Sequence, residues 1–436
     1  MVMKNKLNIY HFLILAGLLF SLYNVWLSYQ SVEKIAASDK GDIANAILEL
    51  PSLCTYNTGI FLAQCTSKSD VKPIEDIGCG DLGYPLLANV ITRLGVKSSP
   101  LTKEDLVRIN IWLNWSGLML LVVALRVAGL KQTSLLTIFA GTYIFINVKE
   151  LSADYYSTFW GVFCIALSGI IFLWVSQRKS IKRHALFSFW VAFFCLAIAL
   201  LIREPMGYIG IAASLSIVLG NFVIDKDRKR KVLKYFIIGF VICSITLMPS
   251  ILVAIRTLVW NVPKGEILPK HGFSYTLLIG IGTVPNSWGI TRADKTATLI
   301  AKNVDPNVVH YSNRHFEIMK KIYFRMFLEK PLEMISIYRV MASRIIAYPT
   351  KIISYYSYVG ILVIGLIICF WRTKQLFKPY FLMGIALSMS CFLALAQGIL
   401  AGLYYSKTAE IGFIVSILAL VEIFTQNKIF KNAYRL

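Results

Sequence analysis

Long apolar stretches separated by short polar ones recur along most of the chain. A helix that crosses a membrane needs about 20 mostly apolar residues, because the hydrocarbon core is about 30 Å thick. Stretches of this length predict an all-α polytopic membrane protein with about ten transmembrane helices. The predicted spans are residues 8–29, 107–128, 132–148, 154–175, 185–202, 205–224, 232–255, 352–371, 380–403 and 409–426.

Positive charges alternate from one connection between spans to the next. In one set of short connections the only basic residues are Lys149, Arg203 and Lys407. Each connection of the other set carries several lysines and arginines. Because lysine and arginine stay on the cytoplasmic side of a membrane, this alternation predicts an even number of spans with both termini cytoplasmic. The basic connections and ends lie at residues 4–6, 126–131, 178–183, 226–234, 372–378 and 428–435.

Two long segments stand out from these short connections, residues 30–106 and residues 256–351. The predicted topology places both of them on the extracytoplasmic face. Functional residues concentrate on loops that a rigid scaffold holds in place. We therefore interpret residues 1–436 as a single transmembrane domain and expect a functional site at its extracytoplasmic face.

Composition supports this class of protein and excludes others. Hydrophobic residues make up 57% of the chain and charged residues 16%, against roughly 45–50% and 25% in soluble globular proteins. In a soluble protein, a net charge of +22 would indicate a nucleic-acid partner. Here the basic residues cluster between spans, so we assign them to topology and to anionic membrane lipids and expect no nucleic acid.

The first extracytoplasmic segment begins with an acidic stretch. Asp39 and Asp42 precede apolar residues spaced as on one face of a helix, and we expect a short amphipathic helix on the membrane surface that ends at Pro51. The carboxylates have two interpretations. They stabilise a helix N-terminus electrostatically, or one of them acts as a general base on an attacking hydroxyl. A second interfacial helix is predicted to have Pro85 in its first turn.

Three cysteines, Cys54, Cys65 and Cys79, lie in this first segment. An extracytoplasmic compartment is oxidising, so one disulfide among the three is expected, with the pairing left open. The other cysteines lie in predicted spans, where they act as small apolar residues. No cysteine–histidine spacing resembles a zinc site, and the acidic stretch is the one place where the sequence offers ligands for a divalent metal.

The second extracytoplasmic segment is strongly basic, with fourteen lysines and arginines against six acidic residues. Such a surface suits an anionic lipid or a phosphate leaving group. Glycine, proline and aromatic residues from His271 to Asp294 predict irregular structure. A basic amphipathic helix is expected to start at Ser312 or Asn313, and Pro331 separates it from a second one. Candidate pocket residues are His271, Asn286 and Asp294, and candidate donor-binding cations are Arg292, Lys295, Arg339 and Arg344.

Arg203, Glu204 and Pro205 form the whole connection between the fifth and sixth predicted spans. Charged side chains at a membrane boundary are costly unless they are satisfied or used. Arg203 either extends its charged end into the interface, as arginines near span ends do, or has a structural or phosphate-facing role. We favour the second interpretation and count Glu204 among the candidate pocket residues.

In this order, the motifs resemble those of the GT-C superfamily of polytopic glycosyltransferases, which includes aminoarabinose transferases and protein O-mannosyltransferases. Asp39 stands at the acidic position of the family's Asp-x-x-x-Tyr motif, although Ile43 stands where the tyrosine is usual. Tyr84 and Pro85, followed by two leucines, resemble the family's Tyr-Pro-Leu-Leu segment. Arg203-Glu204-Pro205 resembles its Arg-Pro-Glu hairpin with the last two residues exchanged. Two further stretches, residues 271–294 and 329–331, also resemble segments of such proteins.

The resemblance implies a GT-C-like fold and an inverting sugar transfer at the outer face of the bacterial plasma membrane. A polyprenyl-phosphate sugar would enter from the outer leaflet. Asp39, or Asp42 in its place, would deprotonate the acceptor, which is a glycan, a lipid or a protein. Arg203 and cations of the second segment would stabilise the leaving phosphate, and Tyr84 would line the pocket. The sequence identifies neither the sugar nor the acceptor.

Two other functions compete with this one. An O-antigen-type polysaccharide polymerase or ligase would also be polytopic with a large outer loop. It would depend on outer arginines and on histidines such as His271, His310 and His315 instead of Asp39. A flippase or transporter of lipid-linked sugars would carry charges or broken helices at mid-membrane, often in repeated halves. The predicted spans hold few charges and show no internal repeat, which counts against transport.

Overall fold

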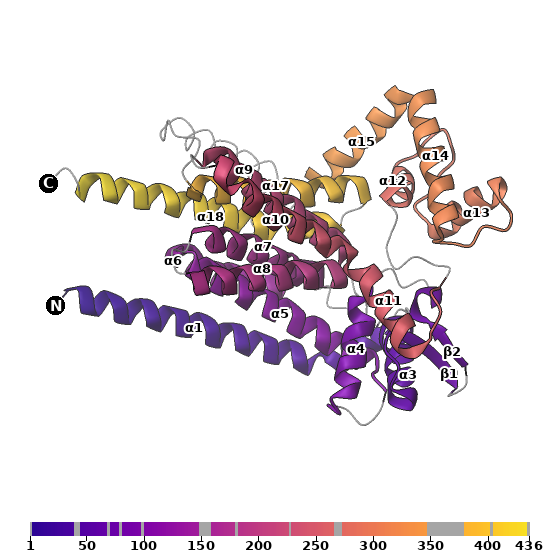
Figure 1. Cartoon of the computed structure of the whole chain (residues 1–436), viewed down its shortest axis with the longest axis horizontal. Coiled ribbons are helices and arrows are strands. Elements are labelled where there is room, and N and C mark those ends of the chain that lie inside the picture. Colours follow the sequence, from indigo (N-terminus) through magenta and orange to yellow (C-terminus); the bar gives the residue numbers. More distant parts are fainter. Residues whose placement is uncertain are drawn as a thin grey trace.

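The chain folds into a bundle of long helices with two groups of shorter elements at one end (Figure 1). Within the described part of the chain, strands occur only in one two-stranded antiparallel hairpin, and most of the rest is helical. The structure, a computed structural model, describes residues 2–38, 44–67, 70–77, 81–96, 100–147, 158–178, 182–225, 228–265, 273–346, 379–401 and 404–433.

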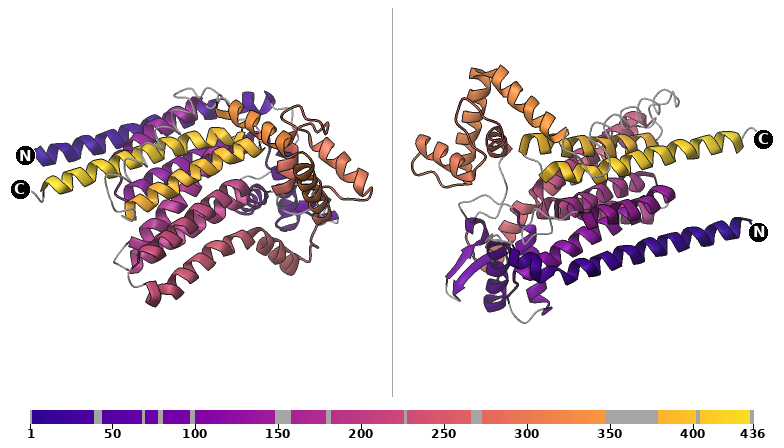
Figure 2. Two further views of the ribbon diagram at one scale, coloured as in Figure 1. Left: turned by 90° about the horizontal axis from the view of Figure 1, so that it is seen from above. Right: turned by 180° about the vertical axis from the view of Figure 1, so that it is seen from behind.

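The bundle helices run roughly in one direction, and α1 begins at the same end of the bundle at which α18 finishes (Figure 1, Figure 2). The opposite end, which we call the loop end, carries the two long segments. The charge alternation predicts this separation, but which end faces the cytoplasm stays a prediction. The bundle consists of α1 (Val2–Gln30), α5 (Lys103–Val127), α6 (Lys131–Asn147), α7 (Phe159–Arg178), α8 (Lys182–Ile202), α9 (Glu204–Ile224), α10 (Arg228–Ser244), η4 (Ile245–Leu247), α11 (Met248–Trp260), α17 (Pro379–Ala401) and α18 (Tyr404–Ala433).

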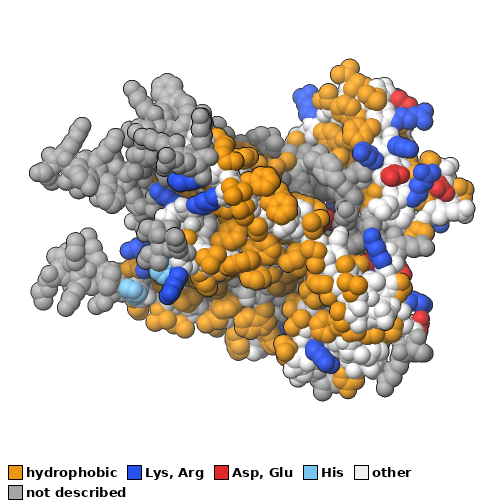
Figure 3. Space-filling model, in the orientation of Figure 1, with side chains coloured by type: hydrophobic (Ala, Val, Ile, Leu, Met, Phe, Trp, Pro, Cys, Tyr) orange, Lys and Arg blue, Asp and Glu red, His pale blue; other side chains and the backbone are white. Residues whose placement is uncertain are grey.

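Six helical stretches of the described chain are long and apolar enough to cross a membrane. They lie in α1, α5, α7, α8, α9 and the continuous α10–η4–α11 helix, and hydrophobic side chains cover the flank of the bundle (Figure 3). The described parts of the predicted spans 132–148, 380–403 and 409–426 are helical and form α6, α17 and α18. The span 352–371 lies outside the described residues. The total of about ten spans therefore stays a prediction.

α7 forms the centre of the bundle. All its residues from Phe159 to Val175 are buried, and it packs against α5, α8, α9, α17 and α18. A helix that is apolar on every side has no polar face to turn outward, so its neighbours bury it. The other five membrane-crossing stretches are buried over half of their length or less, which leaves apolar faces for lipid.

α5 and α7 approach each other so closely that their backbones touch. A Cβ added to Gly161 would overlap the Cα of Asn114, and one added to Gly117 would overlap the carbonyl oxygen of Gly161. The Asn114 side chain accepts a hydrogen bond from the Gly161 N–H at 2.8 Å. Small residues allow this backbone contact between membrane helices, where packing and hydrogen bonds drive association.

Replacing Gly161 by alanine is expected to destabilise the protein by about 1–3 kcal/mol, the usual range for overpacking. The added methyl group would meet backbone atoms, which cannot rotate away as a side chain can. Gly239→Ala in α10 is the matched control, because a Cβ there would meet no atom of the described residues within 4 Å. Thermal unfolding in detergent should show a lower midpoint for Gly161→Ala alone. Equal midpoints for the two variants would contradict the packing argument.

The first long segment folds against the loop end. A disulfide joins Cys54 to Cys65, whereas Cys79 lies outside the described residues. The helix predicted to have Pro85 in its first turn is confirmed as α4. The elements of this segment are α2 (Val32–Ser38), η1 (Asn45–Glu49), α3 (Leu50–Thr58), β1 (Ala63–Ser67), β2 (Asp70–Pro73), η2 (Ile74–Ile77) and α4 (Gly83–Arg93).

Pro51 does not end the helical stretch that precedes it, and this prediction is wrong. The chain continues from η1 into α3 with Pro51 in the first turn of α3, where a missing N–H costs nothing. Ile47 and Leu48 are buried in the same hydrophobic core as the bundle helices. η1 therefore packs on protein and does not simply rest on a membrane surface. The β1–β2 hairpin was not expected, because strands this short carry too little alternation to be recognised.

The second long segment forms a helical group with a core of its own. Ser312 caps α14 by accepting a hydrogen bond from the His315 N–H at 3.2 Å, and Pro331 begins the next helix, both as predicted. The expectation of irregular structure after His271 is wrong for α12, whose residues Tyr275 and Leu278 contribute to this core. The helices are α12 (Phe273–Ile281), α13 (Asp294–Val304), α14 (Asn313–Glu329) and α15 (Pro331–Ile346).

Candidate functional site

A buried ion pair joins Asp81, just ahead of α4, to Arg203 at the turn between α8 and α9. Asp81 is 8% exposed and Arg203 is 3% exposed. The guanidinium group also lies over the ring of Phe159, with 4.2 Å from its central carbon to the ring centroid. Removing a charge from water is costly unless it is paired. The carboxylate and the aromatic face together compensate for the burial of Arg203.

Asp81 also caps α9. Its Oδ1 atom accepts a hydrogen bond from the backbone N–H of Glu204 at 3.2 Å, whereas the side chain of Arg203, the residue before the helix, provides no such bond. The first N–H groups of a helix have no partner within it, and the positive end of the helix dipole favours a negative charge. A carboxylate 122 residues earlier in the chain therefore completes the α8–α9 turn.

Tyr84 lies in the first turn of α4, shortly after Asp81 in the chain, and is 1% exposed. Its hydroxyl donates a hydrogen bond to Asn110 on α5 at 2.8 Å and lies 2.7 Å from the hydroxyl of Thr158, directly before α7. A Cβ added to Gly83 would lie 2.7 Å from the backbone of Ile202 at the end of α8. α4 thus begins in direct contact with α5, with the end of α8 and with the residue that precedes α7.

We call the residues that meet here the loop-end junction, namely Asp81, Tyr84, Phe159, Arg203 and Glu204. The structure brings together three residues that the sequence had singled out, Tyr84, Arg203 and Glu204. It adds Asp81, which sequence reasoning missed. The available signal was weak, an acidic residue shortly before a predicted helix. In this arrangement Arg203 and Tyr84 make their contacts inside the protein, so both act first of all as structural residues.

A second buried ion pair, between Glu75 in η2 and Arg256 in α11, connects the two long segments. Both side chains are fully buried. Arg256 also donates from Nη2 to the carbonyl oxygen of Pro263 at 2.9 Å, which fixes the start of the second segment. Gly265 lies so close to Asp76 that a Cβ there would contact its carboxylate. The two segments therefore touch at the loop end.

The candidate general bases, Asp39 and Asp42, lie outside the described residues, as does His271. The residues on either side of the acidic stretch are described. Ala36 and Ala44 are 3% and 0% exposed and belong to the same hydrophobic core as Tyr84. α2 packs on α5, and η1 packs on α4. The acidic stretch therefore connects two anchored points beside helices of the loop-end junction.

The cations predicted to bind the donor lie in the α12–α15 group and not in the loop-end junction. All four side chains are exposed. The guanidinium group of Arg344 donates from Nη1 to the carbonyl oxygen of Thr283 at 3.0 Å. Basic side chains that are exposed at a membrane surface attract anionic phosphate groups. The four residues are Arg292, Lys295, Arg339 and Arg344.

The side chain of Asn286 is hydrogen-bonded within its own loop. Its Oδ1 atom accepts a hydrogen bond from the N–H of Ile290 at 3.0 Å, and its Nδ2 atom donates to the carbonyl oxygen of the same residue at 2.8 Å. An asparagine that closes a loop in this way mimics a backbone turn. Asp294, the other candidate of this stretch, is the first residue of α13. Asn286 is therefore placed to shape the loop.

His310 and His315, which the polymerase or ligase alternative would use, lie with their ring centroids 4.7 Å apart. His315 is fully buried. Its burial, together with the nearby His310, lowers the pKa of His315 to about 4, so its ring is neutral at pH 7. The ring packs against Tyr275 at 5.5 Å between centroids. His315 thus belongs to the core of the second segment, which disfavours it as a catalytic group.

Among the described residues, no group of three or more histidines, cysteines, aspartates or glutamates is placed to hold a metal ion. The acidic stretch with Asp39 and Asp42 is not part of that set. No protein-family model, no curated protein and no solved structure matches the chain. A function can therefore be inferred from the residues and their arrangement alone.

Proposed function

We propose that the protein is an inverting membrane glycosyltransferase of the GT-C type. It moves a sugar from a polyprenyl-phosphate donor to an extracytoplasmic glycan, lipid or protein. The observation that carries this proposal is the loop-end junction. There the Tyr84 segment and the Arg203-Glu204 turn, which resemble two separate motifs of such enzymes, are joined through Asp81. In this proposal about ten spans cross the bacterial plasma membrane, with both termini in the cytoplasm.

The acidic stretch supplies the base. Asp39, or Asp42 in its place, takes the proton of the acceptor hydroxyl while that oxygen attacks the anomeric carbon from the face opposite the phosphate. The new carbon–oxygen bond forms as the bond to the phosphate oxygen breaks, and the phosphate leaves with the bonding electrons. The configuration at the anomeric carbon is therefore inverted. A positioned general base contributes roughly 10²–10⁴-fold to the rate of such a step.

The leaving phosphate needs positive charge that is placed before the reaction begins. Arg203 is already paired with Asp81, so we assign to it the positioning of α4 against the bundle. Contact with the phosphate then falls to exposed cations of the second segment, Arg292, Lys295, Arg339 and Arg344. This division of roles follows from burial, since a buried and paired guanidinium would have to give up its carboxylate to hold a phosphate.

The proposal is tested with Asp39→Asn and Asp42→Asn in the full-length protein, reconstituted with a panel of polyprenyl-phosphate sugars. Release of free polyprenyl phosphate measures the transfer. One of the two variants should lose activity by about 10²-fold or more, since an amide cannot accept the proton. Asp70→Asn is the control, because this carboxylate of the same segment is 40% exposed and is expected to have no role in the reaction.

Two results would overturn the proposal. If both aspartate variants keep full activity while His271→Ala is inactive, a histidine-dependent polymerase or ligase is favoured. If the wild-type protein releases no polyprenyl phosphate but carries the intact donor across the bilayer of sealed vesicles, the protein is a flippase.

A further inference from the structure

The hairpin formed by α14 and α15 ends in an exposed apolar surface. Leu328 is 79% exposed, Leu332 is 80% exposed and Ile335 is 58% exposed. Phe324, which is 53% exposed, extends this surface along α14. The opposite side of the hairpin packs into the core of the second segment. We call these four residues the hairpin tip, and a continuous apolar surface of this kind normally marks an interaction site.

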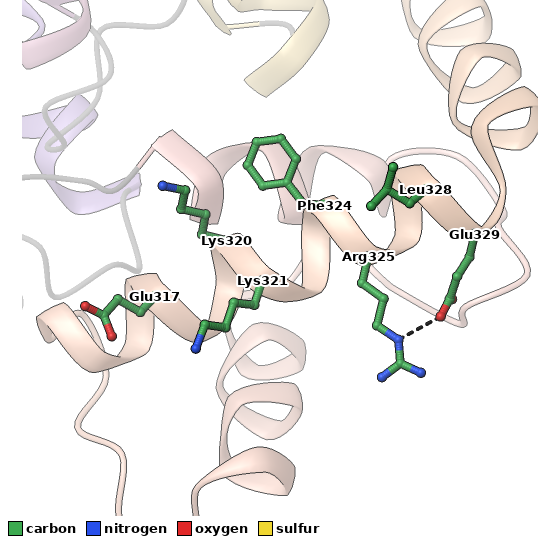
Figure 4. Close-up of a pocket in the computed structure, with 7 residues that line it drawn as sticks. All are labelled: Glu317, Lys320, Lys321, Phe324, Arg325, Leu328 and Glu329. Carbon is green, nitrogen blue, oxygen red and sulfur yellow. Dashed lines mark hydrogen bonds and ion pairs between the residues drawn. The ribbon is translucent and has the colours of Figure 1, made fainter.

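Basic side chains border the hairpin tip. Lys320, Lys321 and Arg325 are exposed on α14. Together with two residues of the tip and with Glu317 and Glu329, they line a shallow hollow along this helix (Figure 4). Glu329 pairs with Arg325 at 2.7 Å, which leaves Lys320 and Lys321 as the basic residues that suit an external anion. Residues 313–346 carry seven lysines and arginines against three glutamates. Adjacent apolar and basic side chains complement a phospholipid, whose acyl chains are apolar and whose anionic headgroup is negative.

The orientation of the hairpin suits a membrane surface. α14 runs across the direction of the bundle helices, and α15 leads back from the tip towards the bundle (Figure 1, Figure 2), where it packs on α17. Hydrophobic side chains gather at the tip with basic ones around them (Figure 3). A helix that lies across the direction of membrane-crossing helices is parallel to the membrane plane, as interfacial amphipathic helices are.

We propose that the hairpin tip inserts into the leaflet at the loop end and binds anionic phospholipid. The apolar side chains of the tip lie among the acyl chains, while Lys320 and Lys321 contact headgroups. Insertion removes apolar surface from water and disturbs no contact in the core of the hairpin. The α12–α15 group is then held against the membrane whether or not a substrate is bound. This inference depends on the membrane-crossing helices and is independent of the sugar transfer.

The test places the photo-crosslinking residue p-benzoylphenylalanine at Leu332 of the full-length protein. The protein is reconstituted in vesicles of phosphatidylethanolamine and phosphatidylglycerol, illuminated and analysed by mass spectrometry. Leu299 on α13, which is 53% exposed, is the matched control position. Phospholipid adducts should be at least about tenfold more frequent at position 332, because only the tip is buried among lipids. Equal yields at the two positions, or adducts to a second protein chain at position 332, would overturn the proposal.

The role of charge is tested in the same vesicles. Lys320→Gln and Lys321→Gln should each reduce the yield of phosphatidylglycerol adducts at position 332 about fivefold, since a basic residue near an anionic surface strengthens binding by that order. Lys302→Gln, an exposed position on α13, should leave the yield unchanged. If the lysine variants match the wild type, or if all three substitutions reduce the yield equally, the assignment of anionic headgroups to the tip is wrong.

Discussion

Replacing Arg256 by methionine is expected to lower the free energy of unfolding by about 3–5 kcal/mol, the range for removal of one partner from a buried ion pair. Arg256 donates from Nη2 to the Oε1 atom of Glu75 at 3.1 Å and from Nη1 to the carbonyl oxygen of Leu62 at 3.0 Å. It also fixes Pro263 at the start of the second segment. Methionine fills a similar volume but leaves the carboxylate of Glu75 in the core without its guanidinium partner.

Chemical unfolding in detergent measures this effect, and two variants control it. Arg325→Met should change stability little, because its ion pair with Glu329 is exposed to solvent, and such pairs contribute little. The double variant Arg256→Met/Glu75→Gln should recover much of the loss, since it removes both buried charges. If Arg256→Met unfolds at the same denaturant concentration as the wild type, the ion pair does not hold the two long segments together.

The bundle could be predicted from the sequence because hydrophobic burial leaves a strong local signal. Apolar stretches of span length became helices wherever the structure describes them, and α7, apolar on every side, is buried in the centre. α1 begins at the end of the bundle where α18 finishes, and both long segments lie at the other end, an arrangement that the charge alternation predicts (Figure 1). The membrane topology itself stays a prediction. Each of these signals can be read within one helix or one connection.

The partners within the loop-end junction could not be predicted in the same way. Arg203 attracted attention because a charge in so tight a turn is costly, but its partner lies 122 residues away. Glu75 and Arg256 are 181 residues apart, and neither was singled out. Ion pairing leaves no periodicity in a sequence. Each acidic residue could pair with any of many basic residues, so the sequence does not identify its partner. The disulfide pairing could not be predicted for the same reason, since spacing does not identify Cys54 and Cys65 as the bonded pair among three cysteines.

Two local predictions failed because tertiary packing outweighed a residue's usual preference. The sequence predicts that Pro51 ends a helix. Proline is equally suited to the first turn of a helix, and the chain continues from Pro51 as α3. The glycine- and aromatic-rich stretch before Gly282 was expected to be irregular. Its residues Tyr275, Leu278 and Ile281 instead lie on the buried face of α12. Burial of one apolar face stabilises a short helix more than weak propensity destabilises it.

Asp81→Asn is expected to destabilise the protein by about 3–5 kcal/mol as well, because it leaves the buried charge of Arg203 without its carboxylate. Asparagine has nearly the same shape, and its Oδ1 atom can still accept the hydrogen bond from the Glu204 N–H. The substitution therefore isolates the effect of charge at the loop-end junction. Asp70→Asn, at an exposed ion pair of the same segment, should leave unfolding unchanged. Unfolding of Asp81→Asn at the wild-type denaturant concentration would show that the pair is dispensable.

The double variant Asp81→Asn/Arg203→Gln separates two roles for Arg203. It removes both buried charges, so it should regain much of the stability that Asp81→Asn alone loses. If Arg203 only positions α4 against the bundle, sugar transfer should return together with stability. If Arg203 holds the phosphate of the donor, transfer should stay low in the refolded double variant, because no cation remains at that position. We expect transfer to return, since the guanidinium group is 3% exposed and already paired with a carboxylate.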